Sequence, residues 1–571
     1  MHELRCVTVL LAVTLLMGCG DDDQNATPIV ATSAEYVVVA GFEEPTTPSP
    51  ATVAAGTARP LPATLAAAVP PDSMLRDAQG NVNFNQLGVL RIPNASVQRP
   101  GALLIIIPGF AAGANSLRLL GEKVVAESTG HTEVWAVDRR ENLLEDVFGM
   151  KLAESARDPE MAVRYYQAGG ELQGRRYYPI QAADVLFMAE WGIDVLMRDI
   201  RAVVRRAQAE QPSVPIYLGG HSFGAFLAPA YAAYDFDPGP GVDSGFADLS
   251  GLILLDGGPG AFPTRFDAPQ LVDRRFLDGG PVALPPHLLI SGLTVGGLRK
   301  LRAPNLTQEA QYPFFQVAGL LSPTVLQQWE IDAMRSQFAG DERSPTFTPP
   351  ADNRFAFAQL FDNDFASIPA LRAALGFVPG GPATLIETPD LAGVNPDGRL
   401  YLPKDLSPAL QNWQPFDQVT PVELTSLADL AEAFFSRPSN TWEWYFPSRL
   451  IHDALLTSNL DTSALSAEVR TELTRFGAPA LEVTQNHRVA LPILAIRGEY
   501  GIVHSTRPNA TAPDHEAVLQ PYFDSLATPP AAIEVRSLAG FYHLDIVLAR
   551  NNPAAQMIAD FIEQQEARSL N

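Results

Sequence analysis

The sequence predicts an α/β fold: a mostly parallel sheet with helices on both faces and a large inserted domain. Short continuous apolar runs, such as 102–107 and 251–255, are typical of strands buried on both faces of a parallel sheet. An amphipathic pattern over 191–210 lies between two such runs, as a crossover helix requires. The strand pattern stops after residue 259 and resumes at residue 491, which predicts the insertion.

The expected strands follow one another as short apolar runs that end in turn or polar residues. In chain order they are 87–92, 102–107, 133–138, 214–218, 251–255, 491–497 and 532–538. In the crossover helix, apolar residues recur every three or four positions: Ile193, Leu196, Ile200, Val203 and Ala207. The run at 36–39 is compatible with a further edge strand.

These elements divide the chain into parts with different expected roles. We expect a first core part over 81–259, a cap or lid insertion over 260–490 and a second core part over 491–571. Residues 19–80 are rich in proline, alanine and threonine, a composition that favours an extended tether.

The first 18 residues have the pattern of a targeting segment. Arg5 precedes an apolar run from Val7 to Met17, which is too short to span a bilayer as a permanent helix. The run ends in Leu16-Met17-Gly18-Cys19, followed by Gly20 and three aspartates, which resembles a bacterial lipobox. The alternative is a plain secretory signal peptide that is cleaved nearby.

The resemblance to a lipoprotein precursor has consequences for the location of the protein. It implies that residues 1–18 are a signal peptide, that Cys19 carries the lipid, and that the protein is anchored to the bacterial cell envelope. Gly20 rather than an aspartate follows the cysteine, which favours the outer membrane.

Composition excludes several other classes of protein. The chain of 571 residues has a net charge of −24, which argues against nucleic acid as a partner because phosphate contacts need clustered Lys and Arg. Its two cysteines, Cys6 and Cys19, leave no thiol for a disulfide framework or a cysteine metal site in the mature chain. We find no spacing that indicates a metal site or a dinucleotide, so we expect no cofactor.

The clearest chemical signal is a Gly-x-Ser-x-Gly motif at 220–224. It directly follows the apolar run at 214–218 and precedes a helical pattern, so Ser222 should lie on a tight turn between a strand and a helix. The backbone N–H groups at the start of that helix, beginning with Phe223, would favour a developing negative charge nearby. The alternative is an ordinary glycine-rich turn.

Polar residues follow other predicted strands. Asp256 follows the run at 251–255, and His543 follows the last strand within Phe541-Tyr542-His543-Leu544-Asp545. With serine, acid and histidine in this chain order at strand ends, the sequence resembles the α/β-hydrolase superfamily, and more narrowly bacterial serine esterases and lipases. The resemblance covers 87–259 and the chain from Leu491 onward.

This resemblance implies a catalytic triad in which Ser222 is the nucleophile and His543 the base. Two acids remain open: Asp256 after its strand, and Glu499 after the strand at 491–497. Phe110 and Phe223 are the expected backbone donors of the oxyanion hole.

Two further positions near this site are less typical. The family's usual His-Gly pair before the first oxyanion donor is Pro108-Gly109 here, although the donor itself is a backbone group. We interpret Asp138-Arg139-Arg140, after the strand at 133–138, as structural salt bridging.

The expected activity is hydrolysis of lipophilic carboxylic esters by a membrane-anchored serine enzyme, through an acyl-enzyme. The insertion carries an aromatic stretch that forms either the core of the cap or an apolar wall for the substrate: Phe434, Phe435, Trp442, Trp444, Tyr445 and Phe446. An amidase or peptidase on the same triad is an alternative, and so is a catalytically dead binding protein. Serine at position 222, rather than aspartate, argues against epoxide hydrolase and haloalkane dehalogenase chemistry.

Overall fold

The fold is described from a computed structural model of the chain. It describes residues 34–260 apart from 94–98, 111, 129–130, 157, 167–168, 179, 181–183 and 240–242. It also describes 361–363, 371–375, 384–387, 399–402, most of 423–467, then 481–503 and 516–569. Within these ranges, no helix combines the length and the apolar character needed to cross a membrane. Cys19 and the expected signal peptide lie outside the described residues.

An eight-stranded sheet organises the molecule, with the strand order β1-β2-β4-β3-β7-β8-β13-β14. Its strands are β1 (Glu35–Ala40), β2 (Gln86–Ile92), β3 (Ala102–Ile107), β4 (Thr132–Asp138), β7 (Ile216–His221), β8 (Gly251–Leu255), β13 (Ile493–Tyr500) and β14 (Ile533–Tyr542). Strand β2 runs antiparallel to both of its neighbours, and the remaining neighbours pair in parallel. The expected fold class, a mostly parallel α/β-hydrolase sheet, is confirmed.

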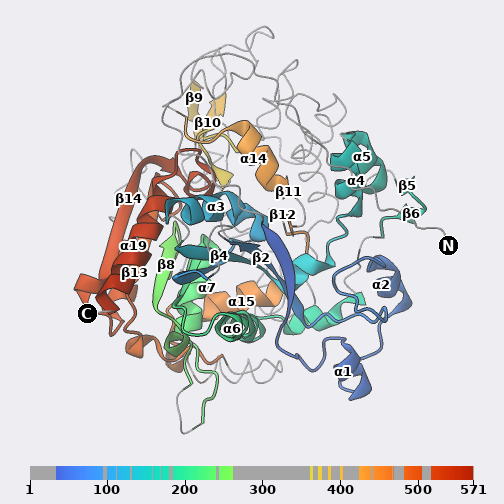
Figure 1. The fold of residues 1–571 in the computed structure, drawn as a ribbon, viewed down its shortest axis with the longest axis horizontal. Helices are drawn as coiled ribbons and strands as arrows, with labels where there is room; N and C mark the ends of the chain where they lie inside the picture. The colour runs from blue at the N-terminus through green and yellow to red at the C-terminus, as the bar shows by residue number, and fades with distance from the viewer. Residues whose placement is uncertain are drawn as a thin grey trace, which may run out of the picture.

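The strands are continuously apolar because both faces of the sheet are covered. In β3, Leu104 and Ile106 belong to one buried cluster, and Leu103, Ile105 and Ile107 belong to the other. Side chains alternate between the faces of a strand, so every residue of such a strand must be apolar. Figure 1 shows the strands of this sheet among the surrounding helices.

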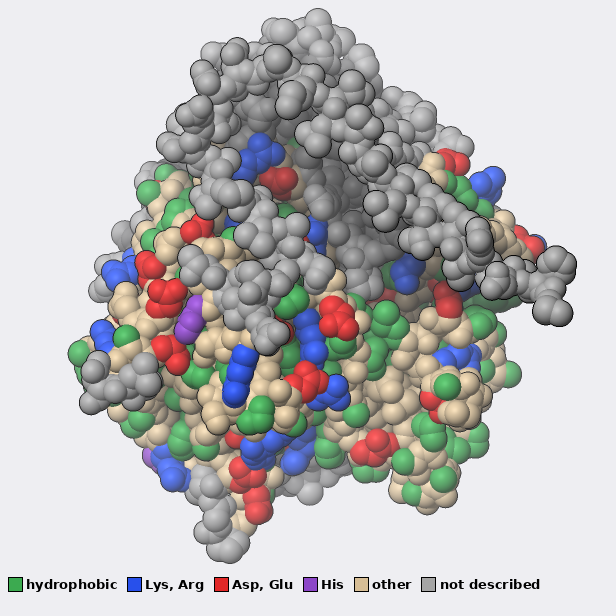
Figure 2. All heavy atoms as spheres, in the orientation of Figure 1, with side chains coloured by type: hydrophobic (Ala, Val, Ile, Leu, Met, Phe, Trp, Pro, Cys, Tyr) green, Lys and Arg blue, Asp and Glu red, His purple; other side chains and the backbone are tan. Residues whose placement is uncertain are grey.

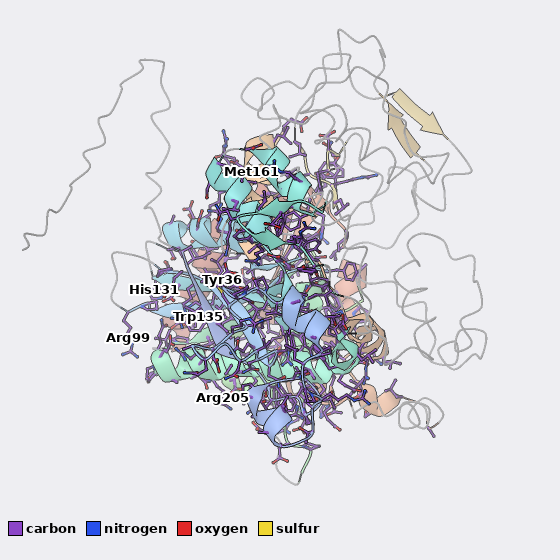
Figure 3. The ribbon with its side chains drawn as sticks, turned by 90° about the vertical axis from the view of Figure 1, so that its right-hand side faces the viewer. Tyr36, Arg99, His131, Trp135, Met161 and Arg205 are labelled. Carbon is purple, nitrogen blue, oxygen red and sulfur yellow. The ribbon has the colours of Figure 1, made fainter. Side chains whose placement is uncertain are left out.

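The two faces carry different helices. Helices α3 (Arg118–Glu127) and α19 (Pro553–Ser569) share the first cluster with the short α18 (Asp545–Leu548). Helices α6 (Ile193–Glu210), α7 (Phe223–Ala232) and α15 (Ser448–Leu456) share the second. In the perpendicular view, Trp135 of β4 lies between Arg205 of α6 and Met161 of α5 (Pro159–Tyr166) (Figure 3).

The structure corrects the expected tether for residues 34–80. Strand β1 pairs along its whole length with β2, and Leu65 of α2 (Ala63–Ala68) is fully buried in the first cluster, as is Leu75. A few well-placed apolar residues bury this proline-rich segment against the core, although its average composition suggested an extended chain. The edge strand expected at 36–39 is confirmed as part of β1, whereas 19–33 lie outside the described residues.

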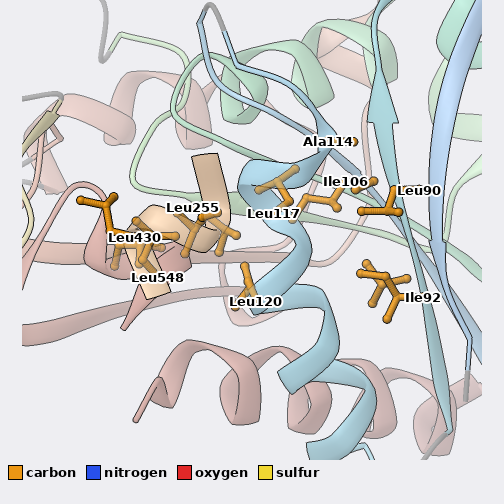
Figure 4. Close-up of a cluster of buried hydrophobic side chains, with 14 of the residues drawn as sticks. Leu90, Ile92, Ile106, Ala114, Leu117, Leu120, Leu255, Leu430 and Leu548 are labelled. Carbon is orange, nitrogen blue, oxygen red and sulfur yellow. The ribbon is translucent and has the colours of Figure 1, made fainter. Parts of the chain in front are cut away.

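Several described residues of the insertion pack into the core. Helix α14 (Leu427–Phe434) places Leu430 in the same apolar cluster as Leu120 of α3 and Leu548 of α18 (Figure 4). Trp444 and Tyr445 are also buried there, and the Trp444 ring meets the Tyr166 ring edge-on. For these two aromatic residues, the cap-core interpretation applies. The side chains of the other four aromatic residues lie outside the described residues.

Candidate active site

Ser222 occupies a strained backbone position between β7 and α7. Its φ of 57° and ψ of −118° fall where few residues other than glycine are found. Glycines make the turn possible: a Cβ on Gly220 would lie 2.1 Å from the Gly224 carbonyl carbon, and one on Gly224 would lie 2.1 Å from the Ile107 oxygen. The local sequence therefore specifies the turn that lifts Ser222 out of the sheet.

Asp256 contacts His543 although the two lie far apart in the sequence. The Nδ1 atom of His543 is 2.6 Å from Oδ2 of Asp256, and both side chains are almost fully buried. An ionised carboxylate only accepts hydrogen bonds, so Nδ1 carries the proton and Nε2 is the basic nitrogen. Backbone N–H groups of Ile502, at 2.9 Å, and Gly498, at 3.4 Å, also donate to Asp256 and fix its position.

The structure separates the two candidate acids. Oε2 of Glu499 accepts a hydrogen bond of 2.8 Å from the backbone N–H of Gly540. Gly540 has a φ of +77° and lies in β14, next to the strand that carries Glu499. Glu499 therefore stabilises an irregular part of β14, and Asp256 is the carboxylate that the fold brings to His543.

His221, the neighbour of Ser222 in the chain, holds the loop that carries His543 after β14. Its ring stacks on the His543 ring with centroids 4.3 Å apart, and its Nε2 lies 3.1 Å from the His543 carbonyl oxygen. Since a carbonyl only accepts, Nε2 of His221 donates. Burial, followed by the nearby His543, lowers the pKa of His221 to about 3, so this ring is neutral at neutral pH.

The loop after β3 lies beside the serine. A Cβ on Gly109 would sit 3.1 Å from Cβ and 3.5 Å from Oγ of Ser222, which places Gly109 next to the serine side chain. Phe223, the other expected oxyanion donor, is the first residue of α7. Phe223 is therefore adjacent to Ser222 along the chain, and Gly109, the residue before Phe110, is adjacent to it through space.

Asp545 anchors the loop that carries His543. Its carboxylate accepts hydrogen bonds from the Thr425 hydroxyl, at 2.6 Å, and from the backbone N–H groups of Ala374 and Tyr542. Burial raises the pKa of Asp545 to about 6, while these hydrogen bonds act in the opposite direction. Because Thr425 and Ala374 belong to the insertion, the insertion contributes directly to the placement of His543.

Sequence reasoning missed three contributors to this site. His221 and Asp545 were visible beside Ser222 and His543, but only their contacts reveal that they hold the histidine loop. The expected salt bridging of Arg139 is confirmed by its contacts with Glu141 and Glu443. In addition, its guanidinium donates to the carbonyls of Gly109 and Ala112 in the loop after β3, which the sequence does not predict. No local signal in the sequence predicts these long-range contacts.

The described residues contain no group of three or more His, Cys, Asp or Glu side chains that could hold a metal ion.

On the face in Figure 2, acidic and basic side chains are interspersed over the described surface.

No family model matches the sequence, and no curated protein does. Solved structures that resemble the chain include a peroxisomal alpha-beta-hydrolase from Saccharomyces cerevisiae, with 12% identity over 93% of this chain and 89% of that chain (TM-score 0.34). A soluble variant of monoglyceride lipase from Saccharomyces cerevisiae is 11% identical over 89% and 99% (TM-score 0.33). The Cif epoxide hydrolase from Acinetobacter nosocomialis is 11% identical over 84% and 85% (TM-score 0.30).

Proposed function

We propose that the protein is a serine hydrolase that cleaves carboxylic esters through an acyl-enzyme. One observation carries the proposal: Ser222 lies on a strained turn at the strand ends where Asp256 contacts His543. A serine hydroxyl is a weak nucleophile unless a base accepts its proton, and a histidine oriented by a buried carboxylate is such a base.

In the proposed reaction, Ser222 Oγ attacks the ester carbonyl while Nε2 of His543 takes the hydroxyl proton. Asp256 stays ionised, keeps the proton of His543 on Nδ1 and stabilises the imidazolium. The negative oxygen of the tetrahedral intermediate accepts hydrogen bonds from the backbone N–H groups of Phe110 and Phe223. His543 then returns the proton to the leaving alcohol, and water releases the acid from Ser222 by the same steps.

Labelling with a fluorophosphonate tests the nucleophile. The probe should label the wild-type protein, and Ser222→Ala should lose the label and ester turnover while it keeps the folded state. His543→Ala should lose turnover to a similar extent, because members of a triad act as a unit. Labelling of the Ser222→Ala variant at wild-type yield would refute Ser222 as the nucleophile. No labelling of a folded wild-type protein would favour the dead binding protein.

The substrate class needs a separate measurement. Aryl esters of increasing chain length, run beside matched aryl amides, distinguish the proposed esterase from an amidase or peptidase on the same residues. We propose neutral, lipophilic esters as substrates. The proposal rests on the aromatic residues of the insertion in the sequence, since an apolar wall would desolvate a charged acyl group without compensating it. Faster cleavage of short anionic esters than of neutral medium-chain esters would contradict this preference.

A further inference from the structure

A buried ionic cluster lies behind the loop that follows β3. Arg139 directly follows β4, and its guanidinium contacts Glu443 of the insertion at 2.7 Å and 3.1 Å and Glu141 at 3.2 Å. The side chains of Arg139 and Glu443 are 1% and 0% exposed, respectively. Burial raises the pKa of both glutamates, while Arg139 lowers the pKa of each. The proposed reaction uses none of these three side chains.

The same guanidinium also binds the backbone of the loop after β3. One terminal nitrogen of Arg139 donates to the carbonyl oxygens of Gly109, at 3.2 Å, and Ala112, at 3.0 Å. These two carbonyls lie on either side of Phe110 in the sequence, so Arg139 holds the loop before and after this residue.

The hydrogen bond to Gly109 has a specific geometric consequence. The carbonyl of Gly109 and the N–H of Phe110 belong to one planar trans peptide, in which they point in opposite directions. A donor that fixes the carbonyl oxygen therefore fixes the direction of the N–H as well. Because Gly109 lies beside the Ser222 side chain, this N–H is a candidate donor to the oxyanion that forms there.

We propose that Arg139 and Glu443 are positioning residues for the oxyanion hole. Glu443 orients the guanidinium, the guanidinium holds the Gly109 carbonyl, and the peptide plane directs the Phe110 N–H toward the developing negative charge. This inference rests on the proposed function. It gives the insertion a role in catalysis, because Glu443 belongs to the insertion and contacts Arg139.

The competing interpretation is an ion pair that only stabilises the fold. Buried ion pairs are often no more stabilising than apolar residues of similar volume, so burial alone does not decide between the two roles. A neighbouring pair provides the matched control: Arg140 and Asp199 are equally buried, and Arg140 binds Asn85 and the Phe42 carbonyl rather than the loop after β3.

The test compares Arg139→Lys and Glu443→Gln with Arg140→Lys and Asp199→Asn. Lysine lacks the planar fork that allows one side chain to hold a carboxylate and two carbonyls together. For each variant, kcat and KM are measured with an aryl ester, together with Ki for a trifluoromethyl ketone, which forms a tetrahedral oxyanion on a serine nucleophile. Thermal unfolding reports stability independently.

If the proposal holds, Arg139→Lys and Glu443→Gln lower kcat by about 10²-fold to 10³-fold with little change in KM, the range seen when one oxyanion donor is lost. Their Ki for the ketone should rise by a similar factor. The control variants should lose stability but keep kcat and Ki. If the cluster variants lose stability and retain wild-type kcat and Ki, the ion pair is structural and the inference is wrong.

Two further outcomes separate this inference from the proposed function. If the wild-type protein turns over the ester and is labelled at Ser222, the function stands and the variants alone decide the inference. If a folded wild-type protein shows neither turnover nor labelling, both fail. Should Arg139→Lys not fold, Glu443→Gln gives the decision, because it replaces the carboxylate with a group of the same shape.

Discussion

At the residue scale, the site depends on side chains that hold other residues in place. Asp256 orients His543, His221 donates to the backbone of His543, and Glu499 supports an irregular part of the neighbouring strand. The chemistry proposed for Ser222 therefore depends on contacts that are individually simple hydrogen bonds. The role of each of these side chains can be tested by a conservative substitution.

The first prediction concerns the two acids. Asp256→Asn should lower kcat by about 10⁴-fold, because an amide next to Nδ1 favours the wrong tautomer of His543. Glu499→Gln should be mild, since its amide oxygen can still accept the hydrogen bond from Gly540. Steady-state kinetics of both variants make the comparison. A larger loss for Glu499→Gln than for Asp256→Asn would reassign the acid.

The second prediction concerns the pH dependence of stability. His221 has a folded-state pKa of about 3, below the ordinary value of 6.5, so folding favours its neutral form. The stabilising contribution of this neutral ring is complete above pH 6.5. As the pH falls from there toward 3, the unfolded chain gains a proton that the folded chain does not, and the free energy of unfolding falls.

His221→Gln keeps a donor for the His543 carbonyl but cannot titrate. Over the acid range its free energy of unfolding should fall less steeply than that of the wild type, by up to about 1.4 kcal/mol per pH unit. Urea unfolding at a series of pH values measures these slopes. His487→Gln, which changes an exposed histidine, is the control. Parallel slopes for wild type and His221→Gln would contradict the prediction.

At the scale of secondary-structure elements, the N-terminal segment contributes to the core. Strand β1 covers the edge of β2, Tyr36 donates to Asp138, and Thr47 accepts a hydrogen bond from the buried Trp191. Strand β1 thus pairs with an edge of β2 that a tether would leave open. An open edge strand is a site for pairing with other chains.

We therefore predict that a chain starting at residue 34 folds and that one starting at residue 81 does not. The shorter chain loses β1 and the buried Leu65 and Leu75, and each such leucine contributes about 1.5–3 kcal/mol. Together with the lost strand, this approaches the total stability of a typical domain. Circular dichroism and thermal unfolding decide it. Leu65→Ala in the full chain should lower the free energy of unfolding by about 2–5 kcal/mol. If a chain starting at residue 81 is soluble and unfolds cooperatively, the tether hypothesis is restored.

At the scale of the whole molecule, the insertion and the core form one site. Glu443 reaches the loop after β3 through Arg139, while Thr425 and Ala374 bind Asp545 next to His543. The insertion thus supports both the loop after β3 and the loop that carries His543, although the sequence suggested a separate cap. Removing the insertion should therefore abolish activity rather than open the site.

We also propose that the whole molecule is held at a membrane through Cys19. In cells, Cys19→Ser should release the protein from the membrane fraction with ester turnover per molecule unchanged, because lipid chains supply the anchor and lie far in sequence from Ser222. Fractionation followed by an activity assay tests this, with Cys6→Ser as the matched control that should leave the anchor intact. Membrane retention of the Cys19→Ser variant would show that something other than this lipid holds the protein.

The sequence by itself determined the strands and the turn at Ser222. Runs such as 102–107 must be buried on both faces wherever they lie, and Gly220 lets strand and helix meet closely around Ser222, because a Cβ there would meet the backbone of Gly224 four residues on. These features depend on residues close together in the chain. The expected strand positions consequently agree with the observed ones to within a few residues.

Only the tertiary structure decided which distant side chains meet. Asp256 follows β8, and Glu499 lies near the end of β13, so both acids are near strand ends. The pairing of β13 with β14 places Glu499 against the Gly540 N–H, which leaves Asp256 as the partner of His543. The choice of Arg139 as the support of the Gly109 carbonyl likewise depends on Glu443, which lies about 300 positions away in the chain. Hydrogen bonds act over about 3 Å, so such contacts follow from how the strands and the insertion pack.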